Sequence, residues 1–399
     1  MVSEEEIEEL NTLGKSVEEI KKQLENLKYG FPKMNILSPA MVGNGIVRLS
    51  DDEKKRLINI YDNSKVDVVK FVPASGAASR MFKGLMEGIM SNDLSGDIEK
   101  LSASIASFPF GNQCEHDMPP LDLAKQVVGA EGLNYAQLPK GLIPFHAYED
   151  GAKTPFEEQL HEASLYGVKN GIAKVHFTIP LAHQQAIEEV NGAACEEFKQ
   201  STNVSMAVEY SEQMTKTDTV AVDRSGNLVR KNGKILFRPA GHGALIENLN
   251  QIDSDLIFVK NIDNVVAASL IEDTVTYKKA LAGILLETKD EIYRLLDQLL
   301  HDSSAEVLNS AMDFVKNHLG VDLQIDITEK ETAKQQLYSY LNRPIRVAGM
   351  VVNTGEPGGG PYWVEDENYG KSLQIVEAIQ IDKEDPKQLE ILNQSTHFN

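Results

Sequence analysis

Short apolar runs alternate along the chain with longer amphipathic stretches. The first run, Val66 to Val72, consists largely of β-branched and aromatic residues, and a Gly/Ser-containing turn separates it from a helical pattern at Met81 to Met90. A strand, a glycine-containing loop and a helix in this order are typical of the first unit of a parallel α/β sheet. Similar runs predict further strands at Lys174–Ile179, Ser205–Tyr210, Lys234–Phe237, Asp255–Val259, Val347–Val352 and Leu373–Ile381.

Helical patterns lie between several of these predicted strands. They cover Pro155 to Tyr166, His183 to Lys199 and Tyr277 to Leu286. Because strands that alternate with helices pair in parallel, the pattern favours a mostly parallel sheet with helices on both faces. The fold class predicted from the sequence is therefore α/β, with a Rossmann-like sheet.

Some stretches fall outside this alternation and suggest a domain organisation. The N-terminal stretch has helical patterns, and Ser16 and Glu19 in it have the spacing of a capping box. Two later stretches carry consecutive helical patterns and are interpreted as insertions into one α/β domain. The predicted divisions are 1–65 (helical N-terminal region), 66–288 (nucleotide-binding α/β core), about 82–136 (helical insertion in that core), 289–342 (second helical insertion) and 343–399 (last part of the core).

Charge narrows the classes of partner. The chain of 399 residues has 39 Lys and Arg against 60 Asp and Glu, which gives a formal net charge of −21. Proteins that bind DNA, RNA or anionic membranes present Lys and Arg to phosphate, so this charge argues against all three partners. It leaves small anionic substrates open, because they need only one local positive pocket.

The two cysteines and the N-terminus point to the compartment. Neither Cys114 nor Cys195 has a spacing to other Cys or His residues that would make a zinc site, and a reducing compartment is the simpler interpretation. The first ten residues are acidic and lack the basic and apolar pattern of a signal peptide. Apolar runs are shorter than the ~20 residues of a membrane helix. We therefore expect a cytoplasmic protein with no membrane partner.

Glycine-containing loops are the first candidates for chemistry, because their backbone N–H groups can approach a phosphate. The two Gly-Lys-Ser tripeptides lack the first glycine of a P-loop, and Gly241-His242-Gly243 lacks the third glycine of a dinucleotide fingerprint. What remains is Ala74 to Met81, directly after the first strand. It is either a phosphate loop ending in Arg80 or a tight turn with an exposed arginine.

Two further segments carry charged residues at loops. Lys140 stands between a proline and a glycine, and is either a point charge for a phosphate or a solvated turn lysine. Asp263 follows the predicted strand at 255–259, where open α/β sheets bind ligands. It would hold Mg²⁺ jointly with substrate phosphates, or else cap a helix. The Gly/Pro-rich tract from Gly349 to Trp363, which includes the Gly355–Pro361 loop, is either a hairpin loop or a moving flap.

A covalent mechanism has no support in the sequence. The nine histidines are scattered, no serine lies in a Gly-x-Ser-x-Gly elbow, and no Ser/His/Asp order can be assigned. His176, inside an apolar strand, is interpreted as a core histidine with its hydrogen bonds satisfied.

Four motifs in one order resemble the UDP-sugar pyrophosphorylase branch of the nucleotide-diphospho-sugar transferases, which have the GT-A fold. In that family an Ala/Leu-Gly-Gly-x-Gly-Thr-Arg loop follows the first strand, as Ala74 to Arg80 does here. A Pro-Lys-Gly-Leu-x-Pro segment is similar to Pro139–Pro144. Pro-x-Gly-His-Gly and Val-x-Asn-x-Asp-Asn segments are similar to Pro239–Gly243 and Val259–Asn264.

The resemblance covers about Val66 to Asn399, without the helical insertions. The whole chain is also similar to an uncharacterised bacterial family related to these enzymes. Two departures concern the first loop, where Ser75 and Ala78 replace glycines. An alanine fits there only if its φ is negative. Since the chain ends inside the segment that resembles the sugar site, we also expect that it is shortened at its C-terminus.

The resemblance implies uridylyl transfer from UTP, or another nucleoside triphosphate, to a sugar 1-phosphate, with release of pyrophosphate and with Mg²⁺ as cofactor. The alternative is a nucleotide-sugar binding or regulatory protein of the same fold without turnover. The sequence names neither the sugar, the base nor the oligomeric state. The residue roles implied are Ser75, Gly76 and Ala77 (nucleotide, through the backbone), Arg80 (pyrophosphate), Lys140 (α-phosphate), Asp263 (Mg²⁺), Gly241 and His242 (uridine), and Asn353, Glu377 and Asn399 (sugar).

Overall fold

The computed structural model describes residues 4–355, 358–367 and 370–399, and the chain in it forms two compact units. Unit 1 consists of Met1–Tyr29 and Lys65–Val275, and unit 2 of Gly30–Ser64 and Thr276–Asn399. Both units contain helices and strands, so the predicted α/β class is confirmed as a mixture of helices and strands. The domain divisions expected from the sequence stay predictions.

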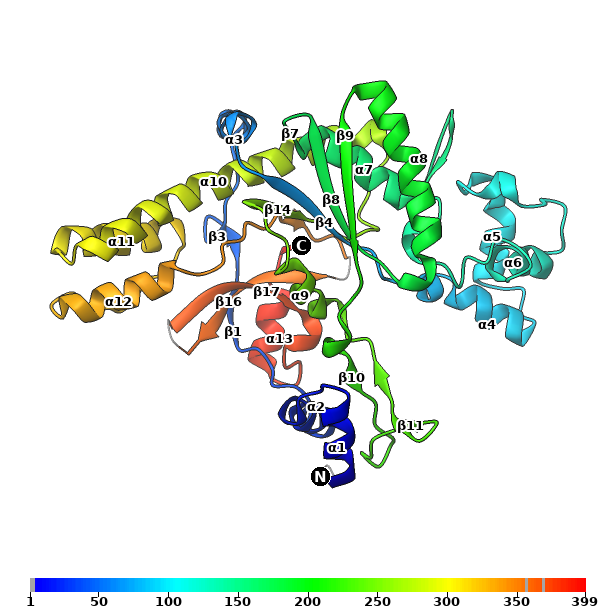
Figure 1. Ribbon diagram of the computed structural model, residues 1–399, viewed down its shortest axis with the longest axis horizontal. Coiled ribbons are helices and arrows are strands. Elements are labelled where there is room, and N and C mark those ends of the chain that lie inside the picture. The colour runs from blue at the N-terminus through cyan, green and yellow to red at the C-terminus, as the bar shows by residue number, and fades with distance from the viewer. Residues whose placement is uncertain (1–3, 356–357, 368–369) are drawn as a thin grey trace. The chain divides into compact units, whose positions relative to one another are not determined.

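A sheet with four parallel strands forms the centre of unit 1 (Figure 1). Its order is β14 (Leu256–Val259), β4 (Val68–Pro73), β8 (Ile172–Thr178) and β9 (Ser205–Ser211), and neighbouring strands pair in parallel. A short strand, β7 (Val168–Lys169), pairs antiparallel with the start of β8. Because the four strands are parallel, their carboxyl ends lie at one edge of the sheet, which we call the carboxyl edge.

Burial explains why these segments form strands. Every residue of β4 except its terminal proline is buried, as expected for a central parallel strand with helices or loops on its faces. Helices α7 (Pro155–Tyr166) and α8 (Gln184–Thr202) pack on the sheet through one cluster that includes Phe156 and Phe177. A capping box at Thr154 starts α7. The predictions of β4, β8, β9, β14, α7 and α8 are confirmed within two residues at most ends.

The strand predicted at Lys234–Phe237 is wrong as a member of the parallel sheet. This region instead forms two short antiparallel pairs. Asn232 and Gly233, which connect two of the strands, both have positive φ, at 54° and 82°, as a tight hairpin turn requires. A parallel pair would need a long crossover connection, for which there is no room here. The four strands are β10 (Thr219–Val220), β11 (Arg230–Lys231), β12 (Lys234–Ile235) and β13 (Phe237–Arg238).

The two N-terminal helices pack on these hairpins. They are α1 (Glu4–Thr12) and α2 (Val17–Tyr29), and they share a small apolar cluster with β10 and β12. The Ser16 hydroxyl accepts a hydrogen bond from the Glu19 N–H at 3.3 Å, as the capping-box spacing predicts. The N-terminal region is therefore helical as expected up to Tyr29.

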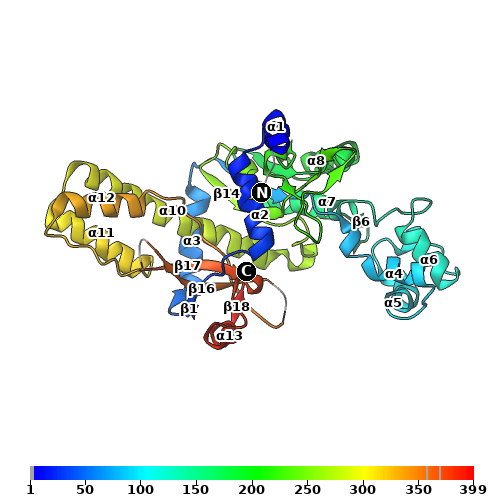
Figure 2. The same ribbon diagram turned by 90° about the horizontal axis from the view of Figure 1, so that it is seen from below.

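The insertion predicted at about 82–136 is helical and has a core of its own. Figure 2 shows its helices in cyan as one group within unit 1. Among the described residues it contains no strand, as the sequence predicts. Its helices are α4 (Lys83–Ser91), α5 (Asp97–Ser104) and α6 (Pro120–Val128).

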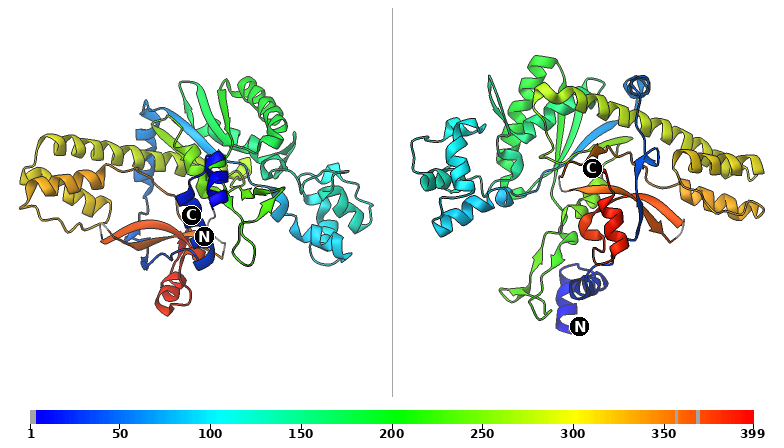
Figure 3. Two further views of the ribbon diagram at one scale, coloured as in Figure 1. Left: turned by 60° about the horizontal axis from the view of Figure 1, so that its bottom comes forward. Right: turned by 180° about the vertical axis from the view of Figure 1, so that it is seen from behind.

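Unit 2 contains an antiparallel sheet of three strands, with β16 (Gly359–Asp366) between β1 (Ile36–Pro39) and β17 (Gly370–Glu377). Helix α13 (Pro386–Asn393) packs against β1, as Figure 3 shows in red and blue. The prediction that Leu373–Ile381 belongs to a parallel sheet is wrong, because a short connection joins β16 to β17 and allows only antiparallel pairing.

The Gly/Pro-rich tract is partly a strand. From Gly359 on it belongs to β16, and Trp363 is buried beside the helices of unit 2, where its indole N–H donates to Asn44 Oδ1 at 3.1 Å. Residues 356 and 357 of the tract lie outside the described residues. The strand predicted at Val347–Val352 shortens to β15 (Val351–Val352), which pairs antiparallel with β18 (His397–Phe398).

The remaining elements of unit 2 are mostly helices, and the predicted helical stretch at 289–342 is confirmed. A capping box between Ser50 and Glu53 starts α3. No helix among the described residues is long and apolar enough to cross a membrane. These elements are β2 (Met41–Val42), β3 (Gly45–Ile46), α3 (Asp51–Asn63), α10 (Ile271–His301, most of it in unit 2), α11 (Ala305–His318) and α12 (Lys330–Leu341).

Alanine substitutions at two helical glycines, one closely packed and one open, test the packing of the helices. A Cβ at Gly283 in α10 would overlap the carbonyl oxygen of Leu57 in α3, so Gly283→Ala forces two packed backbones apart. We expect it to lower the free energy of unfolding by about 1–3 kcal/mol. A Cβ at Gly192 in α8 meets nothing within 4 Å, and Gly192→Ala is expected to raise stability by about 0.5–1 kcal/mol. Chemical denaturation of both variants measures this, and a Gly283→Ala protein as stable as wild type would contradict the described packing.

Candidate functional site

The loop after β4, Ala74 to Arg80, begins at the carboxyl edge. The Ala74 N–H donates to the carbonyl of Thr178 in β8 at 2.8 Å, and the chain then leaves the sheet. In the part of the chain that the structure describes, the backbone N–H groups of Ser75, Gly76 and Ala77 donate to no protein acceptor. Gly76 and Ala77 are exposed. Three consecutive N–H groups are thus available to an anion from solvent.

The residues that depart from the family pattern fit this loop without strain. Neither Ser75 nor Ala78 has a positive φ, and Ala77 has φ −72° and ψ 147°. A Cβ at Gly76 would meet nothing within 4 Å, so the backbone there is open to a close approach. The condition that the sequence set for Ala78, a negative φ, is therefore met.

The Lys140 loop is joined to this first loop by backbone hydrogen bonds. The Lys140 N–H donates to the Gly76 carbonyl at 3.0 Å, and the Ala78 N–H donates to the Leu138 carbonyl at 3.1 Å. Lys140 itself starts a short 3₁₀ turn, Lys140–Leu142. A Cβ at Gly141 would overlap the ring of Phe156, so only glycine allows this turn to lie so close to α7.

The loop after β14 brings Asp263 to the same place. Its backbone is tied to β4 by the Ile262 N–H, which donates to the Pro73 carbonyl at 3.3 Å. The Lys140 ammonium donates to Asp263 Oδ2 at 2.6 Å, and the two side chains are 30% and 32% exposed. The structure therefore unites two residues 123 positions apart that the sequence assigned to a phosphate and to Mg²⁺.

Arg80 is the exposed last residue of the 3₁₀ turn Ala78–Arg80. Among the described residues it forms no ion pair and no side-chain hydrogen bond, so its guanidinium is available to a ligand.

Gly241 and His242 are also at the carboxyl edge, because their segment is anchored to the end of β9. The Gln213 side chain donates to the Ala240 carbonyl at 3.2 Å, and the Asn248 side chain donates to the Glu212 carbonyl at 2.8 Å. Asn248 belongs to the short helix α9 (Ile246–Leu249). His242 is exposed.

The three residues assigned to the sugar lie together in unit 2. The Asn399 N–H donates to the Gly359 carbonyl at 2.8 Å, and Gly359 is the pairing partner of Glu377 in the sheet. Asn353 directly follows β15, and its N–H donates to the Thr396 carbonyl at 3.0 Å. These residues therefore surround the start of β16, while the residues assigned to the nucleotide belong to unit 1.

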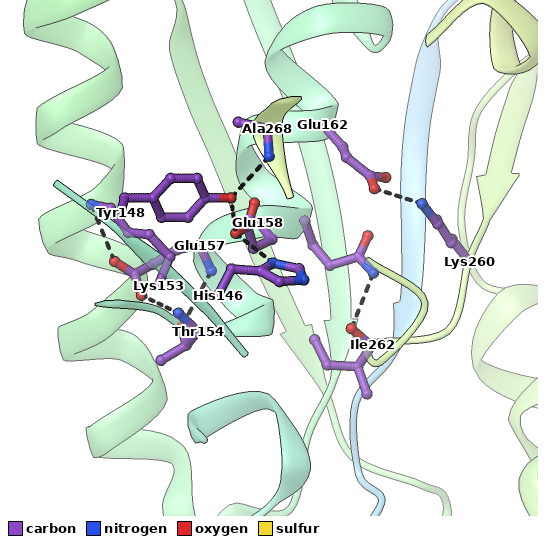
Figure 4. Close-up of polar contacts among 11 residues, drawn as sticks. His146, Tyr148, Lys153, Thr154, Glu157, Glu158, Glu162, Lys260, Ile262 and Ala268 are labelled. Carbon is purple, nitrogen blue, oxygen red and sulfur yellow. Dashed lines mark hydrogen bonds and ion pairs between the residues drawn. The ribbon is translucent and has the colours of Figure 1, made fainter. Parts of the chain in front are cut away.

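Sequence reasoning missed a row of buried polar side chains on α7. Glu158 Oε1 lies 2.9 Å from His146 Nδ1 and accepts a hydrogen bond from the Tyr148 hydroxyl at 2.6 Å (Figure 4). His146 and Tyr148 belong to the hairpin of β5 (His146–Tyr148) and β6 (Gly151–Lys153). The Tyr148 oxygen also accepts from the Ala268 N–H at 3.0 Å. Burial, together with the hydrogen bond to Glu158, raises the pKa of Tyr148 to about 12.

Glu162, one turn further along α7, binds two lysines. Its carboxylate lies 3.0 Å from the Lys70 ammonium and 2.5 Å from the Lys260 ammonium. Burial alone would raise the pKa of Glu162, but the attraction of the two ammonium groups outweighs it and holds the pKa below the ordinary value. A sequence signal existed: Lys70 is a charged residue inside an otherwise apolar strand, and such a residue needs a buried partner.

His176 resembles part of a catalytic triad but does not have a free nucleophile beside it. His176 Nε2 lies 2.8 Å from Ser211 Oγ, and Nδ1 lies 3.6 Å from Glu209. Ser211 Oγ is also 3.0 Å from the Asn248 amide and 3.3 Å from Thr178 Oγ1, so its hydrogen-bonding capacity is used up. Burial lowers the pKa of His176. This agrees with the interpretation of a satisfied core histidine.

The residues around Asp263 fit a magnesium ion that arrives with a nucleotide. No group of three or more His, Cys, Asp or Glu side chains that could hold a metal occurs among the described residues. Mg²⁺ keeps several waters and commonly binds one or two carboxylates together with substrate phosphates, so a single accessible carboxylate at 32% exposure suffices.

Glu162→Gln provides a pH test of the buried ion pairs. We expect this variant to be less stable than wild type by about 2 kcal/mol at pH 7, because an amide has no charge and only one acceptor oxygen, so one of the two lysines also loses its hydrogen bond. Since the folded pKa of Glu162 is below its ordinary 4.5, the contribution is complete above pH 4.5 and is lost as the pH falls through the folded pKa. Denaturant unfolding from pH 7 to acid should therefore show the two proteins converging. A difference that persists or grows in acid would contradict the ion-pair assignment.

Comparison with known proteins adds a family but no function. No curated protein matches the chain, and no solved structure matches it. A family model described as a domain of unknown function, DUF4301, matches residues 3–399, so the chain belongs to the DUF4301 family.

Proposed function

We propose that the protein is a nucleotidyltransferase that converts a nucleoside triphosphate, most simply UTP, and a sugar 1-phosphate into a nucleotide sugar and pyrophosphate. The observation that carries the proposal is the group formed by the free N–H groups of Ser75–Ala77 and the Lys140–Asp263 pair. Backbone donors, one ammonium and one carboxylate are what a magnesium triphosphate requires. The motifs similar to UDP-sugar pyrophosphorylases supply the same residues.

The order of the parallel strands supports this choice of site. Across the sheet the strands lie in the order β9, β8, β4, β14. When these four strands are numbered by their order in the chain, this is the order 3-2-1-4. This is the order of the first four strands of the doubly wound nucleotide-binding folds. In such sheets ligands bind beyond the carboxyl ends of the strands, where both candidate loops lie. We include in the proposal that the core of unit 1 is of the GT-A type.

The reaction needs no covalent intermediate. A phosphate oxygen of the sugar 1-phosphate attacks the α-phosphorus of the nucleotide and forms a new P–O bond. The bond from that phosphorus to the bridging oxygen breaks, and pyrophosphate leaves. Two anions must approach each other, so catalysis consists of positioning and charge neutralisation.

Each charged residue has one role in this scheme. The Lys140 ammonium contacts the α-phosphate, where negative charge accumulates during the transfer, and Arg80 contacts the leaving pyrophosphate. The N–H groups of Ser75, Gly76 and Ala77 bind the remaining phosphate oxygens. Asp263 would hold the Mg²⁺ that arrives with the nucleotide, and the ion would neutralise phosphate charge.

The base and the sugar have separate binding residues. The resemblance assigns Gly241 and His242 of unit 1 to the nucleobase, and Asn353, Glu377 and Asn399 of unit 2 to sugar hydroxyl groups. Such hydroxyls need donors and acceptors, which two amides and a carboxylate provide.

The test is an assay of pyrophosphate release. The purified protein is incubated with UTP, Mg²⁺ and a panel of sugar 1-phosphates, and the other nucleoside triphosphates are tested in parallel. Release that depends on one sugar 1-phosphate is the expected result. UTP binding without release from any sugar would instead favour a nucleotide-sugar binding or regulatory protein. No binding of any nucleotide would contradict both functions.

A further inference from the structure

Helix α7 holds the loop that carries Asp263 at two points. The Gln159 side chain donates to the carbonyl of Asn261 at 2.8 Å and to that of Ile262 at 3.2 Å. The Lys260 ammonium donates to Glu162 at 2.5 Å. Gln159 and Glu162 are almost completely buried, so neither contact is exchanged with solvent. Three consecutive residues before Asp263 are therefore fixed to one helix, and Figure 4 shows the contacts of two of them, Lys260 and Ile262.

Glu162 also connects this loop to the strand next to it. Its other carboxylate oxygen binds Lys70, which lies on β4 with no exposed surface. β4 leads into the loop with the free N–H groups, and β14 leads into the Asp263 loop. The buried Glu162 carboxylate therefore links β4 to the residue that follows β14. The loops after these two strands form the candidate site, so this link fixes their relative positions.

The precision of this geometry matters for the proposed reaction. Asp263 would hold Mg²⁺ in this reaction, and the Lys140 ammonium, which lies 2.6 Å from Asp263 Oδ2, would contact phosphate. Loop residues that hold such groups need support by packed side chains, because a shift of about 1 Å can cost two orders of magnitude in rate. Neither Lys260 nor Glu162 is required for binding substrate itself, since Glu162 is 1% exposed and Lys260 is directed at it.

We propose that Lys260, with Glu162 and Gln159 beneath it, is a positioning residue that fixes the Asp263 carboxylate at the carboxyl edge. This inference rests on the proposed nucleotidyl transfer for its catalytic consequence, but not for its structural one. The structural consequence is that loss of the Lys260 contact loosens residues 260–264.

The same helix contains a matched control. Glu158 lies one turn before Glu162, is also buried, and also binds two partners on other segments. Its partners, however, are His146 and Tyr148 of the β5–β6 hairpin. A variant at Glu158 therefore perturbs α7 to a similar degree without touching the Asp263 loop.

The experiment compares Lys260→Met, Lys260→Arg and Glu158→Gln with wild type. Lys260→Met leaves the Glu162 carboxylate paired with the Lys70 ammonium, so no buried charge is left without a partner and the protein should fold. Amide hydrogen exchange is measured without ligand. We expect exchange in residues 260–264 to rise at least about tenfold in Lys260→Met and to stay near wild type in Lys260→Arg and Glu158→Gln. Glu158→Gln should accelerate exchange in residues 146–153 instead.

Activity supplies the second measurement. In Lys260→Met we expect the Mg²⁺ concentration for half-maximal pyrophosphate release to rise about tenfold and kcat to fall about tenfold, with KM for the sugar 1-phosphate within twofold. Lys260→Arg should keep kcat and the Mg²⁺ concentration for half-maximal release closer to the wild-type values. Unchanged exchange at 260–264 in Lys260→Met, or an equal rise in Glu158→Gln, would overturn the positioning role. If wild type releases no pyrophosphate, the proposed function fails, and the exchange pattern alone still decides whether Lys260 positions the loop.

Discussion

Asp263→Asn is expected to reduce pyrophosphate release at least about 1,000-fold and to remove its response to Mg²⁺. An asparagine keeps the size and one acceptor oxygen of the aspartate, but it has no charge with which to hold the metal. It also releases Lys140 from its ion pair. A loss of 1,000-fold corresponds to about 4 kcal/mol of transition-state stabilisation. The measurement is the initial rate of pyrophosphate release as a function of Mg²⁺ concentration, at saturating nucleotide and sugar 1-phosphate.

Unfolding would not explain such a loss. The Lys140–Asp263 pair is about one-third exposed, and ion pairs of this kind contribute no more than about 1 kcal/mol to stability. Denaturant unfolding of the variant should therefore be close to that of wild type. Asp255→Asn is the matched control, because Asp255 lies just before the amino end of the same strand, where it accepts a hydrogen bond from the Asp67 N–H at 2.8 Å. An Asp263→Asn protein that turns over with the usual Mg²⁺ requirement would remove Asp263 from the metal site.

Local sequence signals predicted the four parallel strands of unit 1 and the helices α7 and α8 well. The apolar run around Phe71 and the capping box at Thr154 each mark an element whose formation depends on residues close in the chain. The same holds for the alternation of strand, loop and helix, which placed both candidate loops after parallel strands. Because carboxyl ends of parallel strands meet at one edge, the meeting of the Ala74–Arg80 and Asp263 loops was also within reach of the sequence. The position of Lys140 was not, because it follows the helical insertion and not a strand of the sheet.

The pairing of the strands was harder to predict from the sequence than their positions. An apolar run of four to eight residues does not specify its partner, and the segment at Leu373–Ile381 looks like a parallel strand until its short connection to β16 is known. The Asn232-Gly233 turn was a missed local signal. The division into two units was not accessible either, since each unit joins stretches that are far apart in the chain.

The buried polar row on α7 shows why a site cannot be completed from motifs. Glu158, Gln159 and Glu162 sit on a helix that reads as amphipathic, and acidic residues on such a helix usually face solvent. Only the fold shows that they face Lys70, Lys260 and the hairpin. Their partners lie on other segments, so no spacing within the helix could identify them.

Lys140→Ala is expected to lower kcat at least about 100-fold, or about 2.7 kcal/mol, while nucleotide affinity changes less. The ammonium interacts most strongly with the α-phosphate in the transition state, so its loss should appear in kcat rather than in KM. Lys153→Ala is the control, because Lys153 ends the β5–β6 hairpin, binds Glu197 of α8 at 3.0 Å and has no role in the proposed transfer. Single-turnover rates with saturating nucleotide separate chemistry from product release. Near-normal rates in Lys140→Ala would remove this lysine from the mechanism and leave the Ser75–Ala77 amides and Arg80 as the phosphate-binding groups.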